Sequence, residues 1–232
     1  MTAASPDTTD ERKETLASHV YDRLRQDIIR VSIDPGEKLH IRSICERFDV
    51  GLSPVREALS RLSKEGLVVQ NDHRGFAVAP MSEEDLVDLT RARCWLNEMA
   101  IRNSIAHGDA AWEESVVLAF HRFSRTPRFA PGKEGERSEA WEIAHRNFHS
   151  SLIAASGSHR IEQYCEQLFD TSERYRHVGR MAGIKGEDRD AEHRALMEAV
   201  IARDADAAAS LITAHFERTA ELVRQVLRNQ LR

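Results

Sequence analysis

Residues 49–67 read DVGLSPVREALSRLSKEGL, and this stretch decides the fold of the amino-terminal third. Ser53 is a candidate helix N-cap, Pro54 takes a position where a first turn tolerates proline, and Gly66 stands where a helix ends. Between these marks the apolar residues recur every three or four positions and form one face. The pattern predicts an amphipathic helix of about 12 residues over 53–64.

The flanking segments complete a small domain. Residues 16–33 contain apolar residues spaced four apart and predict a first helix, and residues 41–48, IRSICERF, predict a second. After the central helix, residues 67–80 read LVVQNDHRGFAVAP, two β-rich runs around a polar tip, which is typical of a hairpin. Three helices and a hairpin form a winged helix-turn-helix, which we expect over 14–80 behind a polar, disordered lead-in at 1–13.

The chain changes character at Ser82. Ser82 and Asp85 form a capping-box pattern, and the helical period then continues to Gly108. Helical periodicity also dominates the remainder of the sequence, without strand-like alternation. We therefore expect a mainly α protein whose second domain, 81–232, is an all-α bundle with further helices at 109–125, 138–156, 159–182, 187–203 and 205–230.

Composition limits the classes of function. The chain has 232 residues, 41% of them hydrophobic and 31% charged, which suits two soluble domains. No apolar run reaches the roughly 18 residues of a membrane span, and the polar start lacks the features of a signal peptide, so a cytoplasmic protein is expected. The absence of a CxxC pair favours reduced thiols over a disulfide framework or a thiolate zinc site at Cys45, Cys94 and Cys165.

Any affinity for DNA must come from the local arrangement of charge. Residues 1–80 carry 12 Lys and Arg against 13 Asp and Glu, so their average charge does not attract phosphate. In a helix-turn-helix the second helix enters the major groove with its amino-terminal residues facing base edges, and the wing reaches the flanking groove or backbone. Taken singly, each basic residue is equally typical of a solvated surface, but together they favour an interface with double-stranded DNA. The candidate contacts are Arg42 in the preceding helix, Ser53, Pro54 and Arg56 at the start of the reading helix, and His73, Arg74 and Gly75 at the wing tip.

The sequence AHRNFHSSL places His145 and His149 on one face of a predicted helix, four positions apart. His193 and His215 lie 11 positions before and after Asp204, where a break predicts a turn between antiparallel helices. Equal offsets put both side chains at the same level, roughly 16 Å from the turn. Up to four imidazoles can thus converge, and three interpretations stay open: a catalytic metal, a sensor's metal or a packed core.

A cluster of this kind favours a divalent metal ion, with zinc first and nickel or manganese as alternatives. Three or four histidines also occur in hydrolytic zinc centres, so a metal-dependent hydrolase fused to a DNA-binding domain is the competing interpretation. Against it, the sequence has neither an HExxH motif nor a nucleophile elbow. A DNA-reading domain has no use in simple hydrolysis, and we expect a regulator rather than an enzyme.

The segments PGEKL, SPVREALSRLSKEGLV and RGFAVAPMSEEDL resemble the winged-helix domain of the GntR superfamily of bacterial transcription regulators, over residues 16–86. The resemblance implies that the helix at 53–64 reads operator DNA. One position departs, because Leu52 stands where the family often has an Arg in V-S-R-x-P-V-R, and that contact is not carried over. Helix-turn-helix proteins bind pseudo-palindromic operators as dimers, so a homodimer is expected.

From Ser82 on, the chain resembles the all-helical FCD effector domain of the FadR subfamily, which implies metal binding and dimerisation by this domain. The family's pattern D-x3-H…H…H carries over to His149, His193 and His215, whereas His145 stands where the family usually has Asp. An imidazole at that position keeps a ligand and removes a negative charge, which suits zinc or nickel.

The same family grips the carboxylate of its effector with an Arg in an R-x-x-L-E element. Arg93 in RCWLN matches, with Asn97 in place of the Glu, and Arg91 is the near alternative. The elements GSH and LFD…RYR further resemble regulators that sense glutarate or related small dicarboxylates. The resemblance implies a repressor whose operator binding is controlled by a small carboxylic acid, a dicarboxylate, at a metal-containing pocket.

Overall fold

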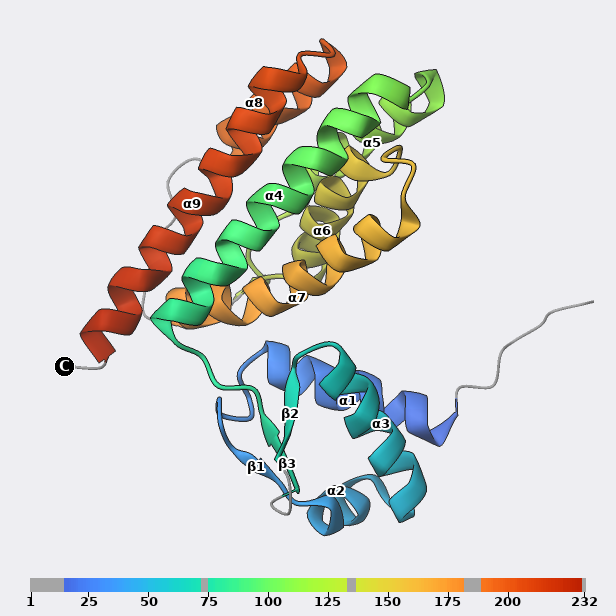
Figure 1. Ribbon diagram of the computed structural model, residues 1–232, viewed down its shortest axis with the longest axis vertical. Coiled ribbons are helices and arrows are strands. Elements are labelled where there is room, and N and C mark those ends of the chain that lie inside the picture. Colours follow the sequence, from blue (N-terminus) through green and yellow to red (C-terminus); the bar gives the residue numbers. More distant parts are fainter. Residues whose placement is uncertain (1–14, 72–74, 133–136, 182–188, 231–232) are drawn as a thin grey trace, which may run out of the picture. The chain divides into compact units, whose positions relative to one another are not determined.

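The computed structural model describes residues 15–71, 75–132, 137–181 and 189–230 (Figure 1). Contacts between residues divide the chain into two compact units, with the boundary between Ala79 and Pro80. The first unit is a winged helix-turn-helix and the second is a bundle of helices (Figure 1), so the expected fold class is confirmed.

The first unit forms around the apolar faces of its three helices. Val20 and Leu24, spaced as the sequence suggested, belong to one core with Val55 and Leu59, and all four side chains are excluded from solvent. Burial of these faces is the main term that holds the unit together. Its elements are α1 (Leu16–Ile29), β1 (Lys38–Leu39), α2 (Ile41–Phe48), α3 (Leu52–Lys64), β2 (Val68–Asn71) and β3 (Gly75–Val78).

The start of α3 corrects the sequence prediction. Gly51, in an extended conformation, is the N-cap, and the helix begins at Leu52. Ser53 is therefore the second helical residue rather than the cap, and Pro54 is the third. Proline is tolerated there because the first four N–H groups of a helix have no partner within the helix.

The wing is an antiparallel hairpin in which β2 pairs with β3 from Val68–Val78 to Asn71–Gly75. Gly75 has a φ of 82°, which a residue with a Cβ rarely adopts. The expected DNA contacts His73 and Arg74 lie outside the described residues. A third strand, β1, was not expected, because two residues show no alternation; it pairs with β3 and completes the sheet order β1-β3-β2.

The second unit consists of helices throughout its regular structure. α4 packs along α9 and α7, α5 packs on α6 and α8, and α8 and α9 form a hairpin. The helix bounds agree with the sequence prediction to within a few residues, and the predicted ends that fall in 182–188 lie outside the described part of the chain. The helices are α4 (Glu83–His107), α5 (Ala110–Arg125), α6 (Glu139–Ile153), α7 (His159–Met181), α8 (Arg189–Ile201) and α9 (Ala205–Gln230).

Five polar contacts hold the first turn of α4. The Ser82 hydroxyl accepts a hydrogen bond from the Asp85 amide at 3.0 Å, as the capping pattern predicted. The Tyr175 hydroxyl of α7 donates to the Asp85 carboxylate at 2.6 Å and accepts from the Ser82 amide at 3.1 Å. Glu83 pairs with Arg224 and Arg228 of α9.

The opposite end of α4 is fixed by Arg203, in the turn between α8 and α9. Its guanidinium donates to the carbonyl oxygens of Ile105 and Gly108, both at 2.7 Å, and pairs with Glu113 of α5 at 2.6 Å. Gly108 is required here because a Cβ would lie 2.1 Å from the ring of Trp112. The α4–α5 and α8–α9 turns are therefore tied together.

The two leucines of α3 provide a matched test of the first unit. Leu59 is fully buried and Leu52 is 55% exposed. We expect Leu59→Ala to lower the free energy of unfolding by about 2–5 kcal/mol, because it removes buried methyl groups and leaves a cavity. Leu52→Ala should change it by less than about 0.5 kcal/mol. Urea denaturation measures both, and equal effects would contradict this placement of α3.

Candidate metal and effector site

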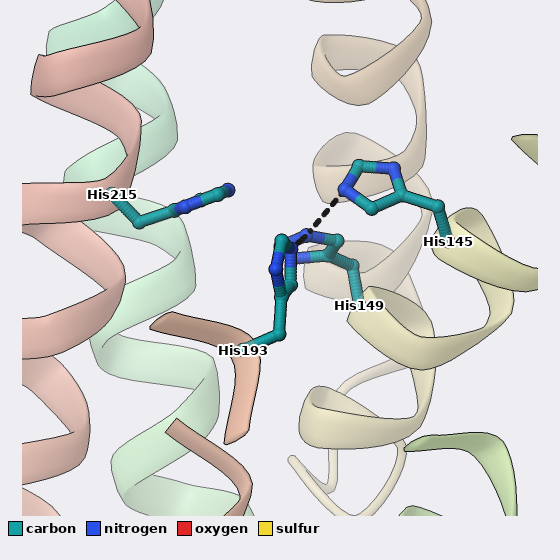
Figure 2. Close-up of side chains that lie close together, drawn as sticks. All are labelled: His145, His149, His193 and His215. Atoms are coloured by element: carbon teal, nitrogen blue, oxygen red, sulfur yellow. Dashed lines mark hydrogen bonds between the residues drawn. The ribbon is translucent and has the colours of Figure 1, made fainter. Parts of the chain in front are cut away.

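Four histidines from three helices meet inside the second unit. Figure 2 shows His145 and His149 on α6, His193 on α8 and His215 on α9, with their rings directed toward one another. Each offers one ring nitrogen, and these four atoms all lie within 4.8 Å of one another. Between 1% and 7% of each residue is exposed, so the cluster is buried.

The helix geometry explains the convergence. The i, i+4 spacing gives His145 and His149 a common face of α6, and the α8–α9 hairpin brings His193 level with His215. Glu192 accepts a hydrogen bond from Nδ1 of His215 at 2.9 Å and also pairs with Arg218. A carboxylate on the outer nitrogen leaves Nε2 of His215 as the inward ligand atom, which is a common arrangement around metal-binding histidines.

The distances between ring nitrogens fit a shared cation. Nε2 of His149 lies 3.1 Å from Nε2 of His145 (dashed line in Figure 2) and 3.3 Å from Nε2 of His193. Zinc–nitrogen bonds of about 2.0–2.1 Å place two tetrahedral ligands roughly 3.3 Å apart. One nitrogen that faces two others cannot satisfy both with a single proton, whereas one ion can be bound by all of them.

The imidazoles are in the form that binds metals. Burial, followed by the neighbouring histidines, lowers the pKa of both His145 and His149 well below the ordinary value for histidine. Both side chains are therefore neutral at physiological pH, with a lone pair for a cation. A donor set of four imidazole nitrogens fits zinc, nickel or another divalent ion that prefers imidazole.

An aromatic shell fixes the ring orientations. Trp141 stacks on His145 with ring centroids 4.9 Å apart, and Phe123 lies 4.9 Å from His193. Phe169 of α7 lies 5.8 Å from His145. Rings held by packing keep a ligand set in place, and an apolar shell strengthens electrostatic interactions within it.

A cavity adjoins the cluster on the side of His149. Its walls come from α4, α6, α7 and α9, and its volume is about 20 Å³. The charged groups on these walls are the guanidinium groups of Arg93 and Arg146 and the carboxylate of Glu166, while Phe169 and Phe216 supply apolar surface. The cavity therefore places two guanidinium groups and one carboxylate beside the histidine cluster.

Arg93 is the most constrained of the cavity residues. It is 5% exposed, its guanidinium lies 3.8 Å from the ring centre of Phe216, and its Nε has no hydrogen-bond partner. Burial, with Arg176 as the next cause, lowers the pKa of Arg93 to about 9, so the group remains charged at neutral pH. Within the described residues no carboxylate pairs with it.

The two arginines proposed from the sequence as effector contacts have different positions. Arg93 lines the cavity together with Asn97, as their spacing of four residues allows. Arg91 is exposed and pairs with Asp88 at 3.7 Å, and it lines a separate groove between α4 and α9. The structure thus brings Arg93, and not Arg91, to the histidines.

The residues proposed for DNA contact lie on the surface of the first unit. Arg42 near the start of α2 and Arg56 in the first half of α3 are both exposed. Ser53 is exposed as well, and Pro54 is half-buried. Gly75 is exposed, and a Cβ built on it would meet no atom within 4 Å. The backbone is accessible there.

Two family models match the chain. Residues 16–78 match the bacterial regulatory proteins of the gntR family, and residues 88–218 match the FCD domain. The chain belongs to the GntR family. This GntR-family protein is therefore a DNA-binding transcription regulator with an FCD domain of the FadR-like subfamily, as the sequence motifs had indicated.

Relatives of this GntR-family chain carry regulator names. It is 34% identical to the HTH-type transcriptional repressor GlaR of Escherichia coli, over 89% of this chain and 95% of that protein. It is 36% identical to the HTH-type transcriptional regulator BphR of Paraburkholderia xenovorans, over 91% and 86%. The solved structure of E. coli McbR/YncC matches with a TM-score of 0.70 at 18% identity, over 91% and 98%, and shows the fold alone.

Several parts of the site were not singled out from the sequence. Glu192 could have been found, because it lies about as far before the α8–α9 turn as His215 lies after it. Arg146 carries no such signal, since only the packing of α6 on α7 brings it to the cavity. All three cysteines are free, as expected, and no described helix has the length and apolar character to cross a membrane.

The buried imidazoles predict an acid-sensitive metal-free protein. Unfolded histidines bind protons below a pH of about 6.5, whereas the folded His145 and His149 do so only at lower pH, so stability must fall as the pH drops below 6.5. The limiting slope is about 1.4 kcal/mol per pH unit for each histidine. Urea denaturation at pH 7.5, 6.5 and 5.5 measures it.

The matched variants are His149→Gln in the cluster and His121→Gln on the exposed face of α5. We expect His149→Gln to reduce the loss of stability between pH 6.5 and 5.5, because one of the two buried histidines is removed, and His121→Gln to leave this loss unchanged. A metal-free native protein whose stability is constant from pH 7.5 to 5.5 would contradict the buried, neutral state of the cluster.

Proposed function

We propose that this GntR-family chain is a transcriptional repressor whose operator binding is controlled by a small carboxylic acid, a dicarboxylate, held at a metal-containing pocket of the helical unit. One observation carries the proposal. Two buried nitrogens on the walls of a single cavity, Nε of Arg93 and Nδ1 of His149, lack hydrogen-bond partners.

A ligand with acceptor oxygens can supply the hydrogen bonds that both nitrogens lack. A buried donor without a partner costs about 1–3 kcal/mol, and more when it belongs to a charged group. When Nε2 of His149 binds a cation, Nδ1 carries the ring proton and becomes a donor like Nε of Arg93. A carboxylate supplies acceptor oxygens and a negative charge, and its planar shape matches a guanidinium.

The metal completes this pocket. His149, His193 and His215 would hold it, with His145 as the fourth ligand, and zinc is the proposed ion ahead of nickel or manganese. When bound, the metal supplies a localised positive charge that attracts a carboxylate oxygen. The chain's own part is to keep the imidazoles neutral, to fix them with the aromatic shell, and to hold Arg93 within reach of the same ligand.

The repressor assignment draws on the name of a relative, GlaR, which is 34% identical over nearly the full chain. For the DNA side of the proposal, Arg56 and Ser53 contact base edges, Arg42 contacts the backbone, and Pro54 with Gly75 allows close approach. We further propose that two copies bind a pseudo-palindromic operator as a homodimer.

The hydrolase alternative requires a free carboxylate base at the metal. Glu192, which contacts the cluster, is engaged by His215 and Arg218, and this arrangement orients a ligand rather than activating water. Glu166, the other carboxylate near the cluster, is exposed to solvent on α7. The geometry therefore favours ligand binding over catalysis. Because the chain also has a DNA-reading unit, ligand binding can control the affinity for the operator.

Elemental analysis of the purified protein tests the metal site. We expect about one metal ion per chain in the native protein and a loss of most of it in the His149→Ala, His193→Ala double variant, because half of the donor set is removed. The exposed pair His121→Ala, His159→Ala is the matched control. Calorimetric titration with glutarate should then show binding by the native protein and none by the site variant, and equal binding by both would refute the metal-anchored pocket.

Operator binding tests the other unit. Arg56→Ala should weaken operator affinity by about 1–3 kcal/mol, at least fivefold, and leave the metal content unchanged, because the side chain is exposed on α3 and remote from the cluster in sequence and unit. Arg23→Ala, at an exposed position of α1, is the control. Fluorescence anisotropy with operator DNA measures both, and unchanged affinity in the Arg56 variant would show that α3 does not read the DNA.

A further inference from the structure

We propose that Arg146 is a second carboxylate anchor, which Asp170 occupies in the ligand-free protein, and that this pair makes the pocket selective for dianionic over monoanionic acids. The inference rests on the proposed function, since it concerns the same cavity. It names a residue that the motifs do not mark, and it identifies the exchange that binding requires.

Arg146 lines the cavity and is paired with a carboxylate outside it. Arg146 lies on α6 between His145 and His149 in the sequence, and it forms an ion pair with Asp170 of α7. Its guanidinium also lies 4.6 Å from the ring centre of Phe169. The side chain of Arg146 is 33% exposed and that of Asp170 is 10% exposed, so Arg146 reaches both the cavity and solvent.

The two arginines of the cavity are in opposite electrostatic states. Arg93 is buried without a carboxylate partner in the described chain, whereas Arg146 already holds one. Both guanidinium groups lie near the ring of Phe169, at 6.0 Å and 4.6 Å from its centre. Arg93, which lacks a carboxylate partner among the described residues, and Arg146, which has one, therefore lie near the same aromatic ring.

This difference determines which acids bind well. The first carboxylate of a ligand meets Arg93 and the histidine cluster, where Arg93 has no ion-pair partner among the described residues. A second carboxylate can pair with Arg146 in place of Asp170, so that the dianion gains an ion pair while the displaced carboxylate is left to solvent. A monocarboxylate offers an apolar end to that position, so Asp170 stays in place and the ligand gains nothing from Arg146.

The size of the cavity supports the exchange. A volume of about 20 Å³ holds roughly one water molecule and is too small for a five-carbon acid. Binding therefore requires a wall to move, and Arg146, whose side chain is one-third exposed, has more room to do so than the buried Arg93. Movement of Arg146 away from Asp170 would enlarge the cavity and free the second anchor in one step.

Calorimetry on the metal-loaded, full-length protein tests the proposal with two acids of equal carbon number, glutarate and pentanoate. The native protein should bind glutarate at least about tenfold more tightly, the scale of one charge-assisted hydrogen-bonded pair. Arg146→Gln should reduce glutarate affinity to that of pentanoate. Asp170→Asn should raise glutarate affinity about threefold or more, because the competing carboxylate is gone, and leave pentanoate affinity unchanged.

The two variants move glutarate affinity in opposite directions, which a purely structural pair cannot produce. If Asp170→Asn weakens glutarate as Arg146→Gln does, while thermal unfolding shows both variants folded, the pair is only a support and the proposal is overturned. The Arg146→Gln, Asp170→Asn double variant should match Arg146→Gln. Arg160→Gln, at an exposed position of α7, should match the native protein.

Failure of this inference is distinct from failure of the proposed function. If the native protein binds both acids equally, Arg93→Gln abolishes both, and Arg146→Gln changes neither, the carboxylate pocket stands and the second anchor is overturned. If the metal-loaded native protein binds neither acid, the pocket itself is not a carboxylate site, and both proposals are overturned.

Discussion

Four imidazoles buried at one level of a helical bundle cannot all be protonated, and the rest of the second unit is arranged around that constraint. Burial keeps His145 and His149 neutral, and one nitrogen of His149 faces two others at 3.1 and 3.3 Å. The cluster is costly as a hydrogen-bonded core and favourable as a ligand set. Packing by Trp141 and Phe123 holds this ligand set in one geometry.

The same unit buries positive charge beside the cluster, and aromatic rings make this possible. The guanidinium groups of Arg93, Arg146 and Arg176 all lie within 6.0 Å of the centre of Phe169. Glu173 neutralises Arg176, and Asp170 neutralises Arg146, which leaves Arg93 as the cation to be paired. Of these three guanidinium groups, two are paired with carboxylates, and only that of Arg93, next to the proposed metal-binding nitrogens, is stabilised by cation–π contact without a carboxylate.

The sequence predicted the relative positions of residues where these follow from the helical repeat or from equal distances to a turn. Helical spacing predicted the shared face of His145 and His149, and equal distances from a turn predicted that His193 lies level with His215. Side-chain direction across helices was not predictable in this way. Arg91 and Arg93 are both on α4, and only the packing of α4 against its neighbours turns one to the cavity and leaves the other exposed. Likewise Gly51 rather than Ser53 caps α3, because glycine and serine are both common N-cap residues and the sequence does not show which of the two takes the cap position. The strand β1 has only two residues, so it shows no alternation from which a strand could be predicted.

Both ends of α4 are tied to other helices. At the carboxyl end Arg203 joins two turns through backbone carbonyls and Glu113. At the amino end the buried Tyr175 and the pairs of Glu83 with Arg224 and Arg228 hold the first turn. Arg93 lies between these ends, about 15 Å of helix from Glu83. α4 is therefore one continuous element that joins the cavity residue Arg93 to the point where the chain leaves the helical unit for the first unit.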